Sequence, residues 1–410
     1  MEHVVIIGAG QAGGRTARAL REQGFEGDIT LIGEEPLLPY ERPPLSKAVL
    51  KGEASVDDVM LADEDAYRQH NITFRANCRA EALDVDARSV RLNDGASLTY
   101  DHLVLTTGGV AKSLPIPGGD LEGVHLLRTA EHAVAVGAEL KEGARLAIVG
   151  GGFIGLEVAA SARQRGCTVT VLEGFERILA RSLPAETAAD VASVHADKGT
   201  EIRTSVRIAS FRGGPRVEAV VFEDGSELAV DAVVVGIGIA PDVRLAEEAG
   251  LAVDNGIVTD EFGRTSKAGV YAAGDCAAAF MPRYGRHVRL ESYQNANLQP
   301  ANLARTIRGE ERVYDPVPWL WSDQYDWNLQ TAGFPNEFDE VVSRGSVAEG
   351  AVVYFSLKDG ELRGVAGLGQ GAAIARDVRF CQMMMERGVS PKPEQLADPG
   401  VQLKDLLKAG

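Results

Sequence analysis

One pattern occurs twice in this sequence: a short apolar run, a glycine-rich turn and a helix-forming segment. In the first copy the apolar run His-Val-Val-Ile-Ile, at residues 3–7, leads into Gly-Ala-Gly-Gln-Ala-Gly at residues 8–13, and the helix-forming segment continues to about Gln23. A short unbroken apolar run is typical of a buried parallel strand. The first copy therefore predicts a strand, a tight turn and a helix packed against the strand.

The three glycines of this turn are spaced as a bound dinucleotide requires. Gly8 permits the tight turn, Gly10 lets the backbone approach a pyrophosphate, and Gly13 lets the helix pack closely on the strand. The helix N-terminus adds free N–H groups and the positive end of a dipole. A second apolar run, at residues 28–32, is followed by Glu34, at the distance past Gly13 where an acid commonly binds a ribose hydroxyl.

The second copy begins at the apolar run of residues 145–149. Its turn is formed by Gly150, Gly151, Gly152, Phe153, Ile154 and Gly155. The next apolar run ends at Glu173, which follows Gly155 at nearly the same distance as Glu34 follows Gly13. One glycine turn is a weak signal, but two turns that each have a strand, a helix and a terminal acid predict two dinucleotide sites. The alternative is a duplicated structural unit with one occupied site.

The residues after Glu173 bear on the choice between NAD and NADP. Gly174 and Phe175 follow the acid, and no arginine stands beside it to accept a 2′-phosphate. The sequence therefore predicts NAD rather than NADP. A further buried strand, residues 230–237, runs into Gly238 and closes this nucleotide-binding segment.

Length and charge narrow the classes of partner. The 410 residues exceed what one hydrophobic core usually organises, so we expect two or three domains. With 59 acidic and 42 basic residues, the net charge of −17 weighs against nucleic acids and anionic membranes as partners. No apolar run reaches the roughly 18 residues of a membrane span, and the N-terminus enters a strand without a basic leader. A cytoplasmic location is expected.

The four cysteines bear on redox chemistry. Cys78, Cys167, Cys276 and Cys381 form no CxxC or CxxxxC pair and show no zinc-ligand spacing. Each is expected to behave as a small buried hydrophobe. We therefore predict no disulfide and no metal site.

Two further stretches are candidates for binding the ligand of the first nucleotide-binding pattern. The segment at residues 36–47 contains four prolines, several apolar residues, Arg42 and Lys47, which favours a ligand-binding loop over a surface linker. A buried strand ends in the small residues Thr107 and Gly108, which allow close approach of a ligand.

Two more features lie in the second half of the chain: a strand that ends near an aspartate, and a change in composition. Asp275 lies at the end of a short strand that begins at Val270, where it either faces a ligand at the strand's carboxyl end or is a plain turn aspartate. From Pro316 the sequence becomes rich in aromatic residues, with strand-like pieces at residues 330–333, 340–344, 351–357 and 362–369 and a helix near residues 374–387. These pieces predict a small α+β domain at the C-terminus.

Over nearly its full length the chain resembles the FAD-dependent, NADH-using ferredoxin reductases of bacterial oxygenase systems, a glutathione-reductase-like class of flavoprotein that binds two dinucleotides. The resemblance is carried by residues 8–13, 39–47, 106–108, 127–129, 150–157, 274–276, 289–292 and 319–325. It implies an α/β fold with two Rossmann-like domains and a small α+β C-terminal domain. The implied boundaries are 1–111 and 240–318 for the FAD-binding domain, 112–239 for the NAD-binding domain and 319–410 for the C-terminal interface domain.

The resemblance also assigns the residues of both nucleotide sites. It places the following residues at FAD: Gly8, Gly10, Ala12, Gly13, Glu34, Arg42, Lys47, Ala80, Thr107, Gly108, Arg128, Asp275 and Tyr293. It places the following residues at NADH: Gly150, Gly152, Phe153, Ile154, Gly155, Glu157, Glu173 and Gly238. Lys47 beside the flavin ring and Glu157 on the nicotinamide side are the implied catalytic pair, because a cation near the flavin stabilises the charge of the reduced ring.

The implied reaction is hydride transfer from NADH to the flavin, followed by two single-electron steps to a [2Fe–2S] ferredoxin. Related disulfide reductases pass electrons through a dithiol beside the flavin, and this chain has no such cysteine pair. Related NADH oxidases and coenzyme A disulfide reductases have a single redox cysteine after the first nucleotide-binding pattern, where this chain has Leu45, Ser46 and Lys47. The electrons are therefore expected to pass directly outward.

The terminal oxygenase and the docking surface remain open at this point. The resemblance favours a Rieske-type aromatic-ring dioxygenase. A cytochrome P450 ferredoxin is the next alternative, then a rubredoxin reductase or NADH oxidase-like activity, and a redox-sensing interaction module is a different class. We expect ferredoxin to dock at Arg305 and Arg308, with Trp321 nearby; these residues could instead be an ordinary surface and core. The protein is expected to be a monomer or a homodimer.

Overall fold

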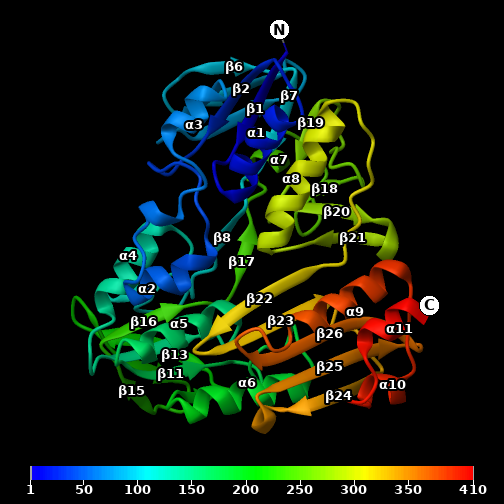
Figure 1. Cartoon of the computed structure of the whole chain (residues 1–410). Helices are drawn as coiled ribbons and strands as arrows, with labels where there is room; N and C mark the ends of the chain where they lie inside the picture. The colour runs from blue at the N-terminus through cyan, green and yellow to red at the C-terminus, as the bar shows by residue number, and fades with distance from the viewer. Residues whose placement is uncertain (1, 410) are drawn as a thin grey trace. The chain divides into compact units, whose positions relative to one another are not determined.

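The strand β1 (His3–Ile7) lies in the middle of a five-stranded parallel sheet. The computed structural model describes residues 2–409. The sheet order is β19-β7-β1-β2-β3, with β2 at Asp28–Ile32, β3 at Ile72–Arg75, β7 at His102–Leu105 and β19 at Val270–Ala272 (Figure 1). Along β1, Val4 and Ile6 pack toward α1 (Gln11–Glu22) and α8 (Tyr293–Ile307), whereas Val5 and Ile7 join the core on the other face of the sheet. The unbroken apolar run is thus buried on both faces, as predicted.

Shorter elements surround this sheet. An antiparallel sheet is formed by β4 (Ala80–Asp84), β5 (Ser89–Leu92) and β6 (Ser97–Thr99), and another sheet by β18 (Ile257–Thr259), β20 (Ala277–Met281) and β21 (Arg286–Arg289). The remaining elements here are α3 (Glu64–Gln69), α7 (Arg244–Glu248) and the paired strands β8 (Gly109–Ala111) and β17 (Ile239–Pro241).

The second glycine pattern builds a second parallel sheet with the order β12-β11-β10-β16-β9. Its strands are β9 (Val124–Leu126), β10 (Arg145–Val149), β11 (Thr168–Leu172), β12 (Glu201–Arg203) and β16 (Ala232–Val235). Its helices are α4 (Ala130–Glu139), α5 (Phe153–Gln164) and α6 (Ala185–Asp197). A small antiparallel sheet of β13 (Ile208–Gly213), β14 (Val217–Phe222) and β15 (Glu227–Ala229) adds its apolar side to the same core.

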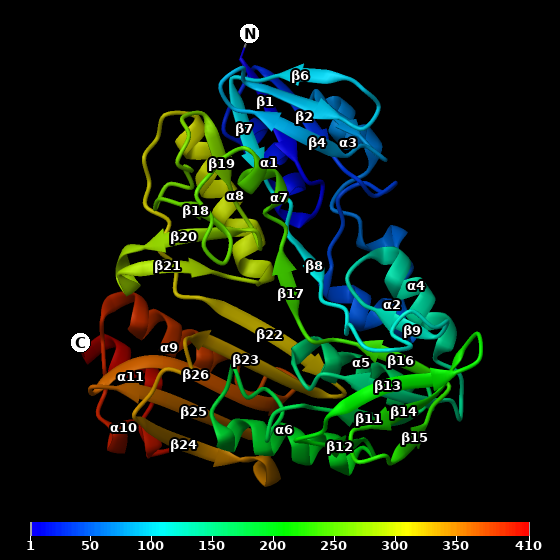
Figure 2. The same cartoon turned by 180° about the vertical axis from the view of Figure 1, so that it is seen from behind.

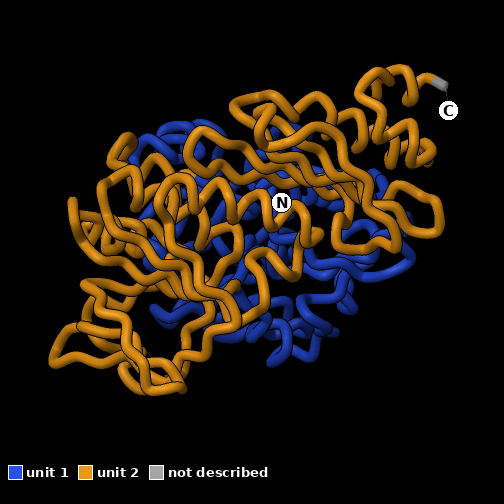
Figure 3. The backbone as a smooth tube through the Cα atoms, turned by 90° about the horizontal axis from the view of Figure 1, so that it is seen from below, with its two compact units in different colours: residues 1–43, 56–110, 239–316 blue, residues 44–55, 111–238, 317–410 orange. Residues whose placement is uncertain are grey.

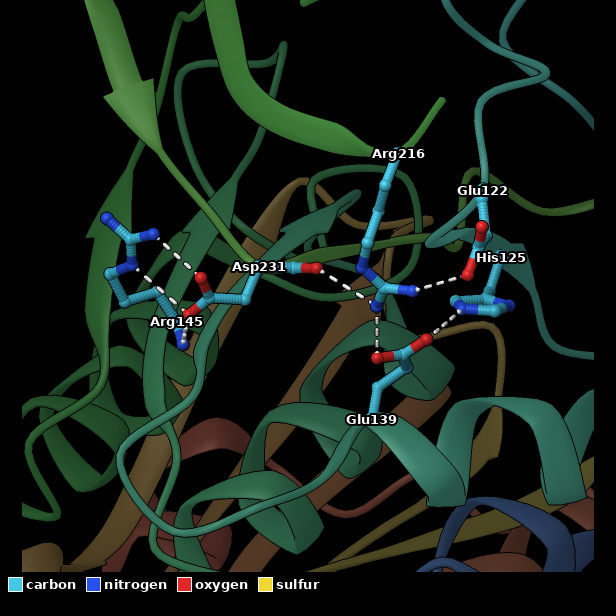
Figure 4. A network of polar contacts seen from close by, with 6 residues as sticks. All are labelled: Glu122, His125, Glu139, Arg145, Arg216 and Asp231. Carbon is cyan, nitrogen blue, oxygen red and sulfur yellow. Dashed lines mark hydrogen bonds and ion pairs between the residues drawn. The ribbon is translucent and has the colours of Figure 1, made fainter. Parts of the chain in front are cut away.

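A polar network around Arg216 ties this small sheet to its neighbours. The guanidinium donates to the backbone carbonyl of Asp231, to Glu122 and to Glu139, and His125 lies 3.2 Å from the other oxygen of Glu139 (Figure 4). Burial alone would raise the pKa of Glu139, but the hydrogen bonds from Arg216 and His125 outweigh it and hold the pKa below its usual value. Its hydrogen bonds join pairs of residues that lie up to 94 positions apart in the chain.

The C-terminal segment forms an antiparallel sheet with the order β22-β23-β26-β25-β24. Its strands are β22 (Trp319–Gln324), β23 (Trp327–Gly333), β24 (Glu340–Ser346), β25 (Ala351–Lys358) and β26 (Glu361–Gln370). One side of the sheet packs on α9 (Ala375–Arg387) and the other on α6 (Figure 2). The short helices α10 (Pro393–Ala397) and α11 (Leu403–Ala409) follow, and the predicted α+β segment is confirmed.

The chain divides into two compact units (Figure 3). The first unit is Met1–Pro43, Val56–Val110 and Ile239–Pro316; the second is Pro44–Ser55, Ala111–Gly238 and Val317–Gly410. The short segment of residues 44–55, which the domain boundaries from the sequence put with the first nucleotide-binding domain, belongs to the second unit and contains α2 (Ala48–Lys51). Within residues 2–409, the structure contains no helix of sufficient length and apolar character to cross a membrane.

Candidate functional site

The first glycine of each turn has a backbone conformation that other residues rarely adopt. The φ angle is +105° at Gly8 and +108° at Gly150. A Cβ on Gly8 would lie 2.3 Å from the carbonyl oxygen of Thr106, and one on Gly150 would lie 2.5 Å from that of Gly236. Both positions therefore require glycine for conformation and for space.

The last glycine of each turn brings its helix onto the preceding strand. A Cβ on Gly13 would lie 1.9 Å from the carbonyl oxygen of Gly8, and one on Gly155 would lie 2.1 Å from that of Gly150. Backbone carbonyls cannot move aside as the end of a flexible side chain can. Each helix start is therefore fixed at this position by the absence of a side chain.

The middle glycine of each turn leaves room for a ligand. Gly10 and Gly152 are the N-caps of the helices α1 and α5, and neither helix has a side-chain cap on its first N–H groups. A Cβ on Gly10 would have only Arg42 within 4 Å, at 3.7 Å, and one on Gly152 would meet nothing within that distance. Two uncapped helix N-termini beside backbone without side chains fit the pyrophosphates of two dinucleotides. Ala12, in the first turn of α1, is buried.

The acid that follows the second strand differs between the two units. The Glu34 side chain is 71% exposed and has one ion pair, at 3.7 Å, with Arg79. The Glu173 side chain is buried, and its two oxygens accept the N–H groups of Gly151 at 2.7 Å and Phe175 at 2.9 Å. The second acid thus fixes the shape of the glycine turn that it follows, in addition to lying where a ribose is expected.

The arginine and tyrosine expected at FAD have carboxylate partners inside the first unit. The guanidinium of Arg42 lies 2.9 Å from Glu35 and over the ring of Tyr40. The hydroxyl of Tyr293 donates to Glu41 at 2.6 Å, and burial together with this hydrogen bond raises the pKa of Tyr293 to about 12. Tyr293 therefore remains a neutral donor at physiological pH.

Asp275 is held at its strand end by residues that the sequence analysis did not single out. The preceding Gly274 has φ +82°, and its N–H donates at 2.8 Å to Gln299, which is buried in α8. Gln299 is also bonded to Asn295, one turn earlier, and Asn295 accepts the hydroxyl of Tyr314 at 2.7 Å. The spacing of two amides by four residues on one helix was the available signal.

The remaining FAD candidates of the first unit lie at backbone turns. The hydroxyl of Thr107 donates to the carbonyl of Asp242 at 2.6 Å, and Gly108 has φ +69°. Ala80 begins β4 as a buried residue, and its carbonyl accepts from Arg244 at 3.3 Å. The carbonyl of Gly108 accepts the N–H of Asp242 at 3.0 Å, so each of the three residues is held in place by a tertiary hydrogen bond.

The second unit brings Lys47 and Glu157 together. Glu157 is in α5 and only 3% exposed, and the Nζ of Lys47 lies 2.8 Å from its Oε2. The same oxygen accepts the hydroxyl of Ser46, and Oε1 accepts that of Ser322 at 2.7 Å. The segment that carries Lys47 is itself bound to α5, because Ser161 donates to the carbonyl of Ser46 at 2.7 Å. A buried carboxylate with three donors, one of them cationic, is satisfied as an ion.

The other candidates of the second unit lie at the start of α5 and in two further segments. Phe153 and Ile154 are its first two residues, and Ile154 is one of the exposed large apolar side chains. Gly238 has φ +99°, and its carbonyl accepts the N–H of Lys112 at 3.0 Å. Arg128 lies half-buried just before the N-cap of α4. The sequence analysis did not single out Arg181, whose guanidinium lies over the ring of the exposed Phe175.

The three docking candidates are distributed over the two units. Arg305 is in the last turn of α8, in the first unit, and Arg308 caps the same helix and is exposed. Trp321, in the second unit, stacks on Trp319 with ring centroids 5.2 Å apart. Its indole N–H donates to Asp323 at 3.1 Å. Arg283 and Arg289, which precede α8 in the chain, have acidic partners, Asp315 and Glu291.

The cysteines are separated and buried. Cys78, Cys167, Cys276 and Cys381 are free, and burial raises the pKa of each thiol. Over residues 2–409, no group of three or more His, Cys, Asp or Glu residues could hold a metal ion. None of the thiols has the lowered pKa that a redox-active thiolate requires.

Comparison with known proteins agrees with this arrangement. Residues 2–299 match the family model described as pyridine nucleotide-disulphide oxidoreductase, and residues 319–407 match the model described as reductase C-terminal. The ferredoxin–NAD(+) reductase component of the anthranilate 1,2-dioxygenase system of Burkholderia cepacia is 41% identical over 98% of both chains. Rhodocoxin reductase of Rhodococcus erythropolis is 40% identical over 98% of this chain and 93% of its own.

A solved structure extends the similarity to three dimensions. The covalent putidaredoxin reductase–putidaredoxin complex superposes with a TM-score of 0.96 at 36% identity, covering 100% of this chain and 98% of the matched one. The confirmed fold class and the matches along the whole length lead to one conclusion. The chain belongs to the pyridine nucleotide-disulphide oxidoreductase family, in the branch of ferredoxin reductases that carry the reductase C-terminal domain.

Proposed function

We propose that the protein is an NADH-dependent ferredoxin reductase that uses FAD to pass electrons to a [2Fe–2S] ferredoxin. The observation that carries the proposal is the combination of two dinucleotide turns with four buried, separated cysteines. A disulfide reductase needs an accessible dithiol beside its flavin. A chain with the same nucleotide turns and no such dithiol must deliver its electrons to an external carrier. The named relatives are ferredoxin reductases, which supports this carrier.

The chain's own residues would hold the two nucleotides in separate turns. In the first unit, the uncapped start of α1 with Gly10 and Ala12 would bind the FAD pyrophosphate, while Glu34, Arg42 and Asp275 would bind its polar chain. In the second unit, the start of α5 would bind the NADH pyrophosphate. The chemistry that FAD supplies in such an enzyme is the conversion of a two-electron hydride donor into single-electron deliveries.

Lys47 and Glu157 would control the charge around this transfer. The ion pair at 2.8 Å keeps a cation next to a buried carboxylate, so that neither charge needs water for neutralisation. Lys47 would stabilise the negative charge that develops on a reduced ring, and Glu157 would hold both Lys47 and the nicotinamide amide. Replacement of Lys47 by Met should therefore slow flavin reduction by on the order of 10²-fold while FAD stays bound.

The terminal acceptor follows from the relatives as a proposal. The anthranilate dioxygenase component favours a ferredoxin that feeds an aromatic-ring dioxygenase. The putidaredoxin reductase supports a P450-type ferredoxin as the second candidate. Measurement of kcat/KM for a Rieske-type and a P450-type [2Fe–2S] ferredoxin at equal ionic strength would separate the two.

We propose docking at Arg305 and Arg308 of the first unit as the route to the carrier. The net charge of −17 repels an acidic ferredoxin, so a local cationic surface is required for binding. Salt screens charges beyond about 8 Å, and the charges near the docking surface therefore affect binding more than the net charge of the protein does. Arg305→Glu with Arg308→Glu should raise the KM for ferredoxin and flatten its salt dependence. The rate of ferricyanide reduction should be unchanged. An equal loss of activity with ferredoxin and with ferricyanide would mean that ferredoxin docks elsewhere.

The decisive experiment follows NADH oxidation by the FAD-loaded protein with and without a [2Fe–2S] ferredoxin. Fast, ferredoxin-dependent oxidation is expected, with NADH preferred over NADPH. A colourless protein that cannot take up FAD, or NADH oxidation that ferredoxin does not increase, would contradict the proposal.

A further inference from the structure

The strand β22 presents two different surfaces in the second unit. Side chains alternate along a strand, and Trp319, Trp321 and the exposed Asp323 follow one alternation. The intervening Ser322 and Gln324 point the other way and are 0% and 2% exposed. Two neighbouring buried polar residues on an edge strand need hydrogen-bond partners, so their partners indicate what they do.

These partners form a line of hydrogen bonds that ends at Glu157. The hydroxyl of Ser322 lies 2.7 Å from Glu157 Oε1, and Nε2 of Gln324 lies 3.1 Å from Ser322 Oγ. Oε1 of Gln324 lies 2.8 Å from Nε2 of His195, a fully buried residue in α6. The line joins α5, β22 and α6.

The chemistry of the end group fixes the direction of every bond in the line. A carboxylate can only accept, so the single hydroxyl proton of Ser322 must go to Glu157. The oxygen of Ser322 must then accept from an amide N–H, so the nitrogen of Gln324 faces Ser322 and its oxygen faces the imidazole. His195 must therefore carry its proton on Nε2.

The surroundings of His195 agree with a neutral ring. Burial lowers the pKa of His195, although the hydrogen bond to Gln324 acts in the opposite direction. On the other side of the ring, the hydroxyl of Tyr325 lies 3.5 Å from Nδ1 and 2.8 Å from the hydroxyl of Thr200. Nδ1 thus faces a hydroxyl that can donate to it.

We propose that Ser322, Gln324 and His195 are positioning residues that orient the carboxylate of Glu157 through a one-way relay of hydrogen bonds. With Oε1 held by Ser322, Oε2 stays directed at Lys47 and Ser46. The C-terminal sheet therefore supplies part of the nicotinamide-side site, in addition to its expected role at the interface with ferredoxin. This inference rests on the function proposed above for Glu157.

The first test compares three variants by stopped-flow reduction of the FAD-loaded protein with NADH. Ser322→Ala removes the donor to Glu157 and should slow reduction about tenfold, because hydrogen bonds to charged groups are among the stronger ones. Gln324→Met keeps the length of the side chain but breaks the relay one step earlier, and should slow reduction about threefold. Ser322→Thr keeps the hydroxyl and should retain most of the parent rate. The dissociation constant of NADH should change less than the rate in each case.

A matched control separates positioning from general loss of stability. Ser356 is a fully buried serine in β25 of the same sheet, and its hydroxyl donates to the carbonyl of Pro335 at 2.7 Å. Ser356→Ala should lower the melting temperature as Ser322→Ala does, but leave the reduction rate at the parent value. Equal rates in parent, Ser322→Ala and Gln324→Met would overturn the inference. Absence of ferredoxin-dependent activity in the parent itself would instead contradict the proposed function.

The second test reads the relay without turnover. Long-range ¹H–¹⁵N NMR of the histidine rings, with the His195 signal assigned from a His195→Leu variant, should show the neutral tautomer protonated on Nε2 at neutral pH. The resonance should shift in Gln324→Met, where Nε2–H loses its acceptor. A ring protonated on Nδ1 would reverse the direction of the bonds and contradict the relay, even if Ser322→Ala were too unstable to purify.

Discussion

The two strand–turn–helix units share a backbone and differ in where they bury charge. Their first and last glycines meet the same kinds of backbone obstacle at almost equal distances. In each unit, an aspartate also accepts at 2.8 Å the N–H that begins the strand before the glycine turn. Asp101, just before β7, accepts from His3 of β1, and Asp231, just before β16, accepts from Arg145 of β10. Of these shared features, the glycines are the ones that a dinucleotide turn of this type needs.

The differences lie in the side chains at equivalent positions. Two positions past the last glycine, the first helix has Arg15, a partly exposed residue paired with Glu22 in the same helix, whereas the second has the buried Glu157 with three donors. At the end of the second strand, Glu34 is exposed and Glu173 is buried. On the function proposed above, the first unit holds a nucleotide, and the second unit would also place the charged groups of Lys47 and Glu157 where they can act on one.

The largest expected effect comes from placing a methyl group on the last glycine of each turn. Gly13→Ala should give a protein that is purified without FAD, because the Cβ would meet a backbone oxygen at 1.9 Å. Gly155→Ala should keep FAD but lose most of its NADH-dependent reduction, because the clash at 2.1 Å is in the second turn. Visible absorbance and NADH titration measure the two outcomes. Loss of the same function in both variants would break the assignment of the turns.

The next effect compares the residues two positions past those glycines. Glu157→Gln removes the charge that neutralises Lys47 and should slow flavin reduction by on the order of 10²-fold, whereas Arg15→Gln, at the equivalent position of the first helix, should leave the rate within about twofold. Stopped-flow absorbance is the measurement. Similar rates for the two variants would mean that the buried carboxylate is purely structural.

The two acids at the strand ends should differ by a smaller factor. Glu173→Gln weakens the bonds to Gly151 and Phe175, so we expect the Kd of NADH to rise about tenfold and the preference over NADPH to narrow. Glu34 accepts no backbone N–H of the first glycine turn among the bonds described, and Glu34→Gln keeps an acceptor for the ribose, so FAD affinity should change by less than about threefold. Equilibrium titrations of NADH and FAD measure the two changes in affinity. A larger change for Glu34→Gln than for Glu173→Gln would contradict this prediction.

The smallest effect is on acid stability, through the network of Arg216. The pKa of Glu139 is lowered in the folded protein, so its contribution is complete above the unfolded value of about 4.5 and is lost as the pH falls through the folded value. Glu139→Gln should therefore flatten the fall in the free energy of unfolding below that value, by about 1 kcal/mol. In the described part of the chain, Asp101 of the first unit has no arginine partner, so Asp101→Asn serves as the control. Urea unfolding at several pH values is the measurement, and parallel curves for parent and Glu139→Gln would contradict the account.

Much of the fold was predictable because its constraints are local. The glycines, the buried runs and the terminal acids of both units follow from the geometry of one strand, one turn and one helix that are consecutive in the chain. The strands of the C-terminal domain were predicted for the same reason, except that β22 was not recognised as a strand. Its residues mix aromatic, acidic and small polar side chains, so no alternation of apolar and polar residues identifies a strand. The strand is recognised only by its antiparallel pairing with β23.

The sequence by itself determined that the chain binds two dinucleotides and carries no cysteine pair, because these properties depend on which residues follow one another. The family resemblance already implied Lys47 and Glu157 as a pair. Only the tertiary structure decided that Glu157 is buried and bonded to Ser46, 111 positions earlier, and to Ser322, 165 positions later. The same holds for Gln299 behind Gly274 and for His195 behind Gln324. Such partners are set by how helices and strands pack against one another, and a hydrogen bond between distant residues leaves no periodicity in the sequence from which it could be read.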